Sequence, residues 1–112
     1  MCSISGICNF EKKPPTQIVE LMTKSLSHRG PDDIGFFQNE NISLGHNRLS
    51  IIDLRNSKQP MKDDDNKNII IFNGEIYNFK ELKSNLESLG HKFEPEGDTE
   101  VILKSYNQWG VE

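Results

Sequence analysis

The sequence predicts an α+β domain whose strands and helices lie in separate layers. Short segments with the apolar pattern of strands lie outside and between three segments whose apolar residues recur at helical spacing. The 112 residues allow one domain at most, and no internal repeat is present. A sheet that packs against helices accounts for this order of elements.

The first part of the chain predicts a strand followed by a helix. Residues 1–10 alternate as in a strand, and residues 12–15 interrupt the pattern. Thr16 is suited to cap the helix that follows. Apolar residues at helical spacing then mark one face of this helix: Ile18, Val19, Met22 and Leu26.

A loop, a hairpin and a further strand are expected next. Residues 28–33 (HRGPDD) contain Gly and Pro and predict a turn or structured loop. A hairpin is expected around Asn39–Glu40, with strands at residues 34–38 and 41–44. Residues 48–54 predict a second apolar strand.

The second half predicts a buried strand and a capped helix. Residues 68–73 are expected to form a strand, and the unbroken apolar run at 69–72 predicts burial on both faces. The polar residues 62–68 predict a hairpin loop. Asn78, with Glu81 three residues later, matches a capping box. The apolar face of the helix is then formed by Phe79, Leu82, Leu86 and Leu89.

The last elements are a short strand and a helix. Gly90 is expected to end the capped helix, and residues 91–93 predict a short strand. Asp98 or Thr99 begins the last helix, and Gly110 ends it. Its inner face is expected to consist of Ile102, Tyr106 and Trp109.

Composition and charge exclude several classes of protein. The chain is 34% apolar and 27% charged, with a net charge of −4 and no basic patch, which argues against nucleic-acid binding. It has no secretory signal and no apolar run near the ~20 residues of a membrane span. Two cysteines without a disulfide framework predict a cytoplasmic protein.

The predicted strands leave the edges of the sheet bare. At least four strands are expected, yet the chain stops directly after a helix. Because a long apolar edge invites aggregation, we expect the chain to be the first part of a larger domain.

Cys2 is the most informative single position. Removal of Met1 would leave a thiol and a free α-amine on one residue. Free thiols and α-amines titrate at about 8.5 and about 7.7–8.0, so the amine can accept the thiol proton without a histidine base. The alternative is a cysteine without function. A disulfide to Cys8 is excluded if the intervening residues are extended, since about 20 Å would separate the two α-carbons.

Asn73 and Gly74 follow the predicted buried strand and are candidates for an oxyanion hole. The Asn side-chain amide and the Gly backbone N–H can direct two donors at one developing oxyanion. The alternative is a tight turn, which Asn-Gly favours. Because a helix rather than a strand is expected to follow, the hairpin alternative is weakened.

Three charged residues could bind a free amino acid. Arg48 suits a carboxylate, while Glu75 and Asp98 suit an ammonium group. Alternatively, Asp98 is a helix cap, and Arg48 pairs with an internal carboxylate such as Asp53, Asp32 or Asp33. Together with a nucleophile and an oxyanion hole, these three residues fit glutamine as the substrate. No histidine has a partner at metal-ligand spacing, so no metal site is expected.

Five motifs in order resemble those of a known family: Cys2, HRGPDD at 28–33, GHNRLSIIDL at 45–54, FNGEIYNF at 72–79 and GDTEVIL at 97–103. Across nearly the whole chain, the sequence is similar to the N-terminal glutaminase domain of the asparagine synthetase B family. That domain is a class II glutamine amidotransferase. The resemblance implies the αββα sandwich of the N-terminal-nucleophile hydrolases, here only its N-terminal part.

The resemblance also implies roles for individual residues. Cys2 is the nucleophile and its own α-amine the base, while Asn73 and Gly74 form the oxyanion hole. Arg48 holds the substrate α-carboxylate. The backbone of Ile51 and Ile52 lines that pocket, and Glu75 and Asp98 receive the α-ammonium group.

The implied reaction is hydrolysis of glutamine to glutamate through a γ-glutamyl thioester. The released ammonia would pass to a C-terminal ATP-pyrophosphatase domain that makes asparagine from aspartate. That domain is absent from this chain, and with it the implied ATP and Mg²⁺, so no cofactor is expected here. A homodimer is one assembly open to the full enzyme.

Two departures from the family pattern and two alternative functions remain. Ser3 replaces the Gly that usually follows the nucleophile, and Asn47 stands where a charged residue is frequent.

One alternative function is the glutaminase part of an enzyme that aminates sugars of surface polysaccharides. The other is a catalytically silent module that mediates an interaction.

Overall fold

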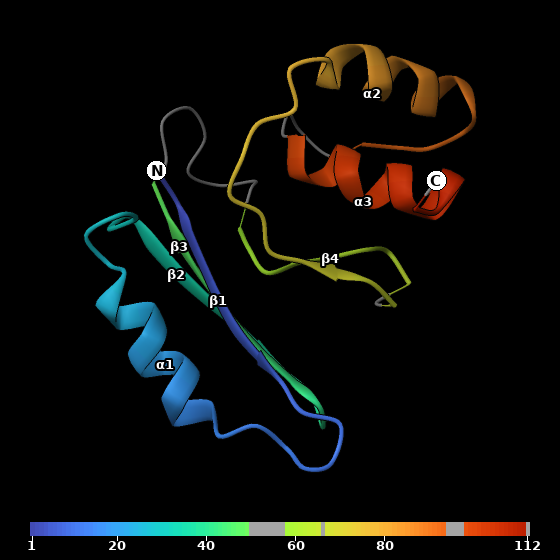
Figure 1. Ribbon diagram of the computed structural model, residues 1–112. Helices are drawn as coiled ribbons and strands as arrows, with labels where there is room; N and C mark the ends of the chain where they lie inside the picture. Colours follow the sequence, from blue (N-terminus) through green and yellow to red (C-terminus); the bar gives the residue numbers. More distant parts are fainter. Residues whose placement is uncertain (50–57, 66, 94–97, 112) are drawn as a thin grey trace.

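A computed structural model describes residues 1–49, 58–65, 67–93 and 98–111 of the chain (Figure 1). This part of the chain contains two sheets and three helices. The elements are β1 (Ser3–Cys8), α1 (Thr16–Ser25), β2 (Asp33–Gln38), β3 (Ile42–Arg48), β4 (Met61–Lys62), β5 (Ile69–Ile70), α2 (Phe79–Ser88) and α3 (Asp98–Trp109). None of these helices has the length and apolar character needed to cross a membrane.

The larger sheet has the antiparallel order β1-β3-β2, with β3 in the centre. The predicted hairpin around Asn39 is confirmed. The Asn39 side chain accepts hydrogen bonds from the backbone N–H groups of Asn41 and Ile42 at 2.9 and 2.8 Å. Such a local bond replaces backbone pairing within the turn, and it fixes the register in which β2 and β3 pair.

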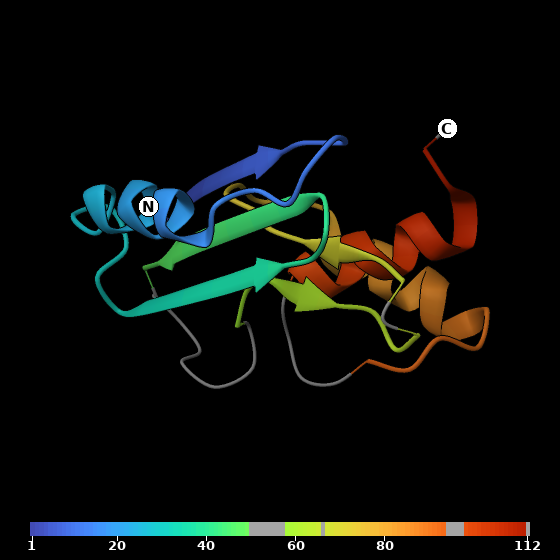
Figure 2. The ribbon, with the colours of Figure 1, turned by 90° about the horizontal axis from the view of Figure 1, so that it is seen from below.

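The elements lie in the order helix, sheet, sheet, helix. Helix α1 covers one face of the larger sheet, where the hydroxyls of Ser5 and Thr23 are 2.8 Å apart. The two-stranded sheet β4-β5 lies on the other side, and α3 packs against both of its strands. Helix α2 packs on α3, and both lie on the side opposite α1 (Figures 1 and 2). The predicted α+β layering is therefore confirmed.

Few apolar side chains are fully buried among the described residues. Those that are come from the three helices: Val19, Leu86, Val101 and Leu103. Each contributes about 1.5–3 kcal/mol relative to an exposed side chain. Polar side chains are buried beside β1 and β3 instead, and they need hydrogen-bond partners there.

Several predicted elements differ in the structure. The apolar run at 69–72 is half-buried rather than covered on both faces, and only Ile69–Ile70 form a strand, because its partner β4 has two residues. Residues 91–93 form no strand. The expected strand at 48–54 falls largely on residues outside the described part, and Arg48 itself is the last residue of β3.

Helix boundaries were predicted better than helix faces. Gly90 and Gly110 follow α2 and α3 with φ of 98° and 74°, a region that favours glycine, so both predicted ends are confirmed. Asn78 stands at the N-cap of α2, but its side chain makes no capping bond, so the predicted capping box does not form. Pro15 rather than Thr16 is the N-cap of α1.

The predicted inner face of α3 was wrong at two of its three positions, since only Ile102 is half-buried. Tyr106 and Trp109 are nearly half exposed, whereas Thr99, Val101, Leu103 and Lys104 are buried. Helix α3 packs against β4 and β5 on one side and α2 on another, so two directions of the helix are covered instead of one stripe. Spacing alone could not identify them.

Candidate active site

Cys2 lies at the entry to β1, beside the end of β3. The Leu49 backbone N–H donates to the Cys2 Sγ at 3.4 Å, and the Leu49 carbonyl oxygen is 3.8 Å from the same sulfur. The thiol is half-buried, while the preceding Met1 is 70% exposed. The sulfur therefore rests on the backbone directly after Arg48, and Met1 extends into solvent.

The chain on both sides of Cys2 is held by side chains. The Arg29 Nε donates to the Cys2 carbonyl at 3.4 Å, from the loop at 28–33. The Ser3 hydroxyl donates to the Asn47 Oδ1 at 2.9 Å, and both side chains are buried. The two departures from the family pattern, Ser3 and Asn47, are thus direct partners. The Asn47 Nδ2 has no partner within the described part of the chain.

Arg48 stands at the same end of the sheet and is 7% exposed. Its carbonyl accepts the backbone N–H of Asp32 at 3.0 Å, which fastens the 28–33 loop to β3. Asp33 lies directly opposite Arg48 in the β2–β3 register. Arg48 and His46 are two residues apart on β3, so they project from the same face of the sheet.

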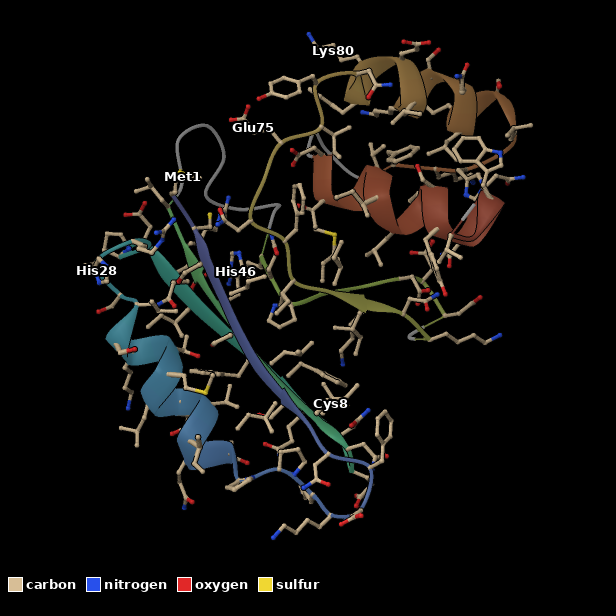
Figure 3. The ribbon with its side chains drawn as sticks, in the orientation of Figure 1. Met1, Cys8, His28, His46, Glu75 and Lys80 are labelled. Carbon is tan, nitrogen blue, oxygen red and sulfur yellow. The ribbon has the colours of Figure 1, made fainter. Side chains whose placement is uncertain are left out.

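The segment 72–76 crosses this face. The His46 Nε2 lies 3.2 Å from the Phe72 carbonyl oxygen, and Asn73 and Gly74 follow Phe72 directly. A Cβ at Gly74 would stand 2.9 Å from the Phe72 ring, so a larger residue here would require that ring to shift. Asn73, Gly74 and Glu75 are exposed. In Figure 3, Glu75 lies at the Met1 end of the sheet, and Cys8 lies at the other end.

Asp98, the first residue of α3, is half-buried. Its Oδ2 accepts the backbone N–H of Ile76 at 3.2 Å. The carboxylate therefore binds the segment that carries Glu75. Asp98 is helical rather than the residue before the helix, so it is not the simple cap considered from sequence.

His46 lies at the candidate site, although the sequence indicated no role for it. Its ring is 1% exposed. Burial lowers the pKa of His46, the bond to the Phe72 carbonyl raises it, Arg48 lowers it and Asp33 raises it, with a net lowering. A carbonyl only accepts, so Nε2 carries the proton of a neutral ring. The sequence signal that could have identified His46 is its position as a polar residue in a strand, because a buried polar side chain requires a hydrogen-bond partner.

The structure thus brings most of the predicted site residues to one end of the larger sheet. Cys2 and Arg48 meet at the ends of β1 and β3, and the segment with Asn73, Gly74 and Glu75 crosses beside them. Ile51 and Ile52 lie outside the described residues. The half-buried Cys2 and the exposed Cys8 are both free thiols that form no disulfide with each other.

A family model described as a glutamine amidotransferase domain matches residues 1–112. The chain belongs to this family. The family assignment agrees with the one expected from the five sequence motifs.

Relatives of this amidotransferase domain carry names that describe a larger enzyme. Asparagine synthetase [glutamine-hydrolyzing] 1 of Bacillus subtilis is 42% identical over the whole chain, which covers 18% of that protein. A putative asparagine synthetase [glutamine-hydrolyzing] 2 of Methanocaldococcus jannaschii is 43% identical, again over the whole chain and 25% of the relative. Asparagine synthetase B [glutamine-hydrolyzing] of Escherichia coli is 36% identical over the whole chain, which covers 20% of that protein.

The amidotransferase domain therefore spans about a fifth of the length of these relatives. The names fit the predicted asparagine synthetase branch of the family. They describe relatives that hydrolyse glutamine, which is the chemistry that the residues around Cys2 predicted.

Proposed function

We propose that this domain hydrolyses glutamine to glutamate and ammonia, with Cys2 as nucleophile after removal of Met1. The α-amine takes the thiol proton, and Sγ attacks the side-chain amide carbon. The tetrahedral intermediate collapses as the amine returns the proton to the leaving nitrogen, which departs as ammonia. Water then cleaves the γ-glutamyl thioester, giving glutamate and restoring the thiol.

The observation that carries the proposal is the position of the Cys2 sulfur in a chain of this family. The sulfur lies 3.4 Å from the Leu49 backbone nitrogen, adjacent to the buried Arg48. Met1 is exposed and so accessible to an aminopeptidase. A nucleophile needs fixed geometry near the group that binds its substrate, and the ends of β1 and β3 provide both.

Substrate recognition is proposed as follows. Arg48 binds the α-carboxylate in a bidentate pair, together with the backbone of Ile51 and Ile52. Glu75 and Asp98 receive the α-ammonium group. Asp98 uses one oxygen for the Ile76 N–H, and a carboxylate has enough lone pairs to accept a second donor.

Asn73 and Gly74 are proposed as the oxyanion donors. Their exposure and their place beside the β3 face support this role, because an oxyanion hole must open toward the bound substrate. The helix-sheet-sheet-helix order supports the N-terminal-nucleophile αββα sandwich, of which this chain would be the N-terminal part.

The ammonia is proposed to serve asparagine synthesis in a C-terminal synthetase domain of the same protein. The names of the relatives favour asparagine over an aminated sugar as the product. ATP and Mg²⁺ would belong to that domain, and no residue of this chain is assigned to them.

The test compares the two cysteines in the full-length protein, after intact mass has verified the loss of Met1. Cys2→Ala is expected to abolish glutamine hydrolysis and labelling by a glutamine-like diazo-ketone. The matched change Cys8→Ala should leave both at the wild-type level, since Cys8 lies at the other end of β1. Hydrolysis that survives Cys2→Ala, or that proceeds at full rate with Met1 attached, would refute the mechanism.

A further inference from the structure

The peptide groups of Phe72 are held by side chains rather than by a strand partner. The Phe72 N–H donates to the Gln59 Oε1 at 2.5 Å, and the Phe72 carbonyl accepts from the His46 Nε2 at 3.2 Å. Strand β5 ends at Ile70, so neither bond belongs to a sheet ladder. Phe72 directly precedes Asn73 and Gly74, and these bonds therefore set where the two residues begin.

Gln59 connects this segment to two other elements. Its Nε2 donates to the Thr99 Oγ1 at 3.3 Å, in the first turn of α3, and Thr99 is 3% exposed. Its backbone touches β2, because a Cβ at Gly35 would stand 1.8 Å from the Gln59 carbonyl oxygen. The amide orientation is unambiguous, because the Phe72 N–H can only donate and requires the oxygen. Gln59 thus contacts β2 through its backbone, and its side chain joins the 72–76 segment to α3.

The far end of the segment is also attached to α3, through Ile76 and Asp98. Both attachments to α3 lie in its first turn, at adjacent residues. Asn73, Gly74 and Glu75 are the exposed residues between these two fixed ends. Because exposed side chains and turns move easily, the direction of the Asn73 amide and the Gly74 N–H depends on the fixed ends.

We propose that Gln59 is a positioning residue for the oxyanion donors Asn73 and Gly74, with His46 as a second and weaker holder. The inference rests on the proposed glutamine hydrolysis. Oxyanion donors act through preorganisation, so their value is lost when they are free to reorient. Gln59 touches neither substrate nor nucleophile, and it acts through the Phe72 peptide.

A positioning role and a purely structural role differ in what they change. The oxyanion forms only in the transition state, so loss of the positioned donors lowers kcat and leaves KM nearly unchanged. It also leaves the thiol intact, and the rate of Cys2 alkylation by iodoacetamide stays at the wild-type level. General loosening of the fold would change kcat, KM and alkylation together.

Two variants of Gln59 remove different numbers of its side-chain hydrogen bonds. Gln59→Leu removes both bonds, whereas Gln59→Glu keeps an acceptor for the Phe72 N–H and loses only the donor to Thr99. We expect kcat to fall about 10- to 100-fold in Gln59→Leu, the size of effect that a misplaced group causes. Gln59→Glu should recover most of this loss. The matched control is Gln108→Leu, because Gln108 is an exposed glutamine of α3 whose side chain bonds to His91 rather than to the 72–76 segment.

A second measurement does not depend on activity. Hydrogen exchange of the backbone amides at 72–76 in the full-length protein should accelerate at least about 10-fold in Gln59→Leu, since the Phe72 N–H loses its acceptor. In Gln108→Leu it should be unchanged. Exchange that is equal in Gln59→Leu and wild type would overturn the holding role of Gln59.

The two measurements separate this inference from the proposed function. Faster exchange with an unaltered kcat would overturn the link to the oxyanion. A wild-type protein that has lost Met1 and still fails to hydrolyse glutamine would refute the proposed function and that link together. In that case the exchange result still decides whether Gln59 holds the segment.

Discussion

Cys2 and the Asn73–Gly74 pair face the same reaction, yet the protein holds them in different ways. Cys2 enters β1, whose whole length pairs with β3 from Ser3↔Asn47 to Cys8↔Ile42. The segment 72–76 has left β5 and is held by side chains of Gln59, His46 and Asp98. The Cys2 region combines a backbone ladder with side-chain contacts, whereas the 72–76 segment is held by side-chain contacts.

The difference shows where each region is sensitive to substitution. A ladder is made of many backbone hydrogen bonds, so replacing one side chain within it removes none of them. A peptide group held by one side chain loses its partner entirely when that side chain is replaced. The nucleophile should therefore tolerate changes around it better than the oxyanion donors do.

The largest expected effect comes from forcing Gln59, which holds the 72–76 segment, away from the larger sheet. Gly35→Ala would place a Cβ 1.8 Å from the Gln59 carbonyl oxygen, and a backbone atom can yield only by moving β2 and residue 59 apart. We expect a loss of about 3 kcal/mol in the free energy of unfolding, the upper range for overpacking. Urea unfolding of the full-length protein measures it.

Gly6→Ala serves as the control for this change. Its Cβ would meet the Leu44 Cδ2, the end of a flexible side chain, at 3.0 Å and the Ser43 carbonyl oxygen at 3.2 Å, far less severe contacts than 1.8 Å. A loss in Gly35→Ala no larger than that in Gly6→Ala would show that β2 and residue 59 are not tightly packed.

A smaller change separates the regions. Ser3→Ala removes the donor to the Asn47 Oδ1 and leaves a buried acceptor unpaired, which costs about 1–3 kcal/mol. Unfolding experiments measure the cost, and Ser25→Ala, an exposed serine that bonds to its own helix, is the matched control. Hydrogen exchange at 72–76 should stay unchanged in Ser3→Ala. Faster exchange there would mean that the two regions are coupled.

The smallest effect concerns pH. Burial lowers the pKa of His46 from 6.5, so the unfolded chain binds a proton at a pH where the folded chain does not. The stability from neutral His46 is complete above about 6.5 and is lost as pH falls toward the lowered folded value. The groups that face the ring are Arg48 and Asp33, besides the Phe72 carbonyl. His46→Gln should flatten stability between pH 7 and 5, whereas an equally steep profile would assign the loss to another group.

Local signals explain what the sequence could predict. The Asn39 turn, the glycine ends at Gly90 and Gly110 and the alternation of β1 each depend on a few neighbouring residues, and each is confirmed. Cys2, Arg48 and Asn73 were found because their chemistry is unusual for their positions. The structure places Cys2 and Arg48 at the same end of the larger sheet, and the roles of all three residues in the reaction stay predictions.

Long-range contacts explain what could not be predicted. The run at 69–72 and the faces of α3 were assigned by hydropathy, but burial depends on which element covers them. Gln59 and His46 are separated from Phe72 by 13 and 26 positions. No spacing rule links a glutamine before a proline to a peptide group across the fold, so the holding residues became visible only in three dimensions.

Because the Ser3 hydroxyl donates to Asn47, a substitution at one of these two positions changes which residue is favoured at the other. A glycine after the cysteine has no hydroxyl group. The buried Oδ1 of an asparagine at position 47 would then lack its hydrogen-bond donor. Homologues with glycine at position 3 are therefore expected to replace Asn47, and those with serine to retain an acceptor there. An alignment of the family should show the two positions covarying across β1 and β3.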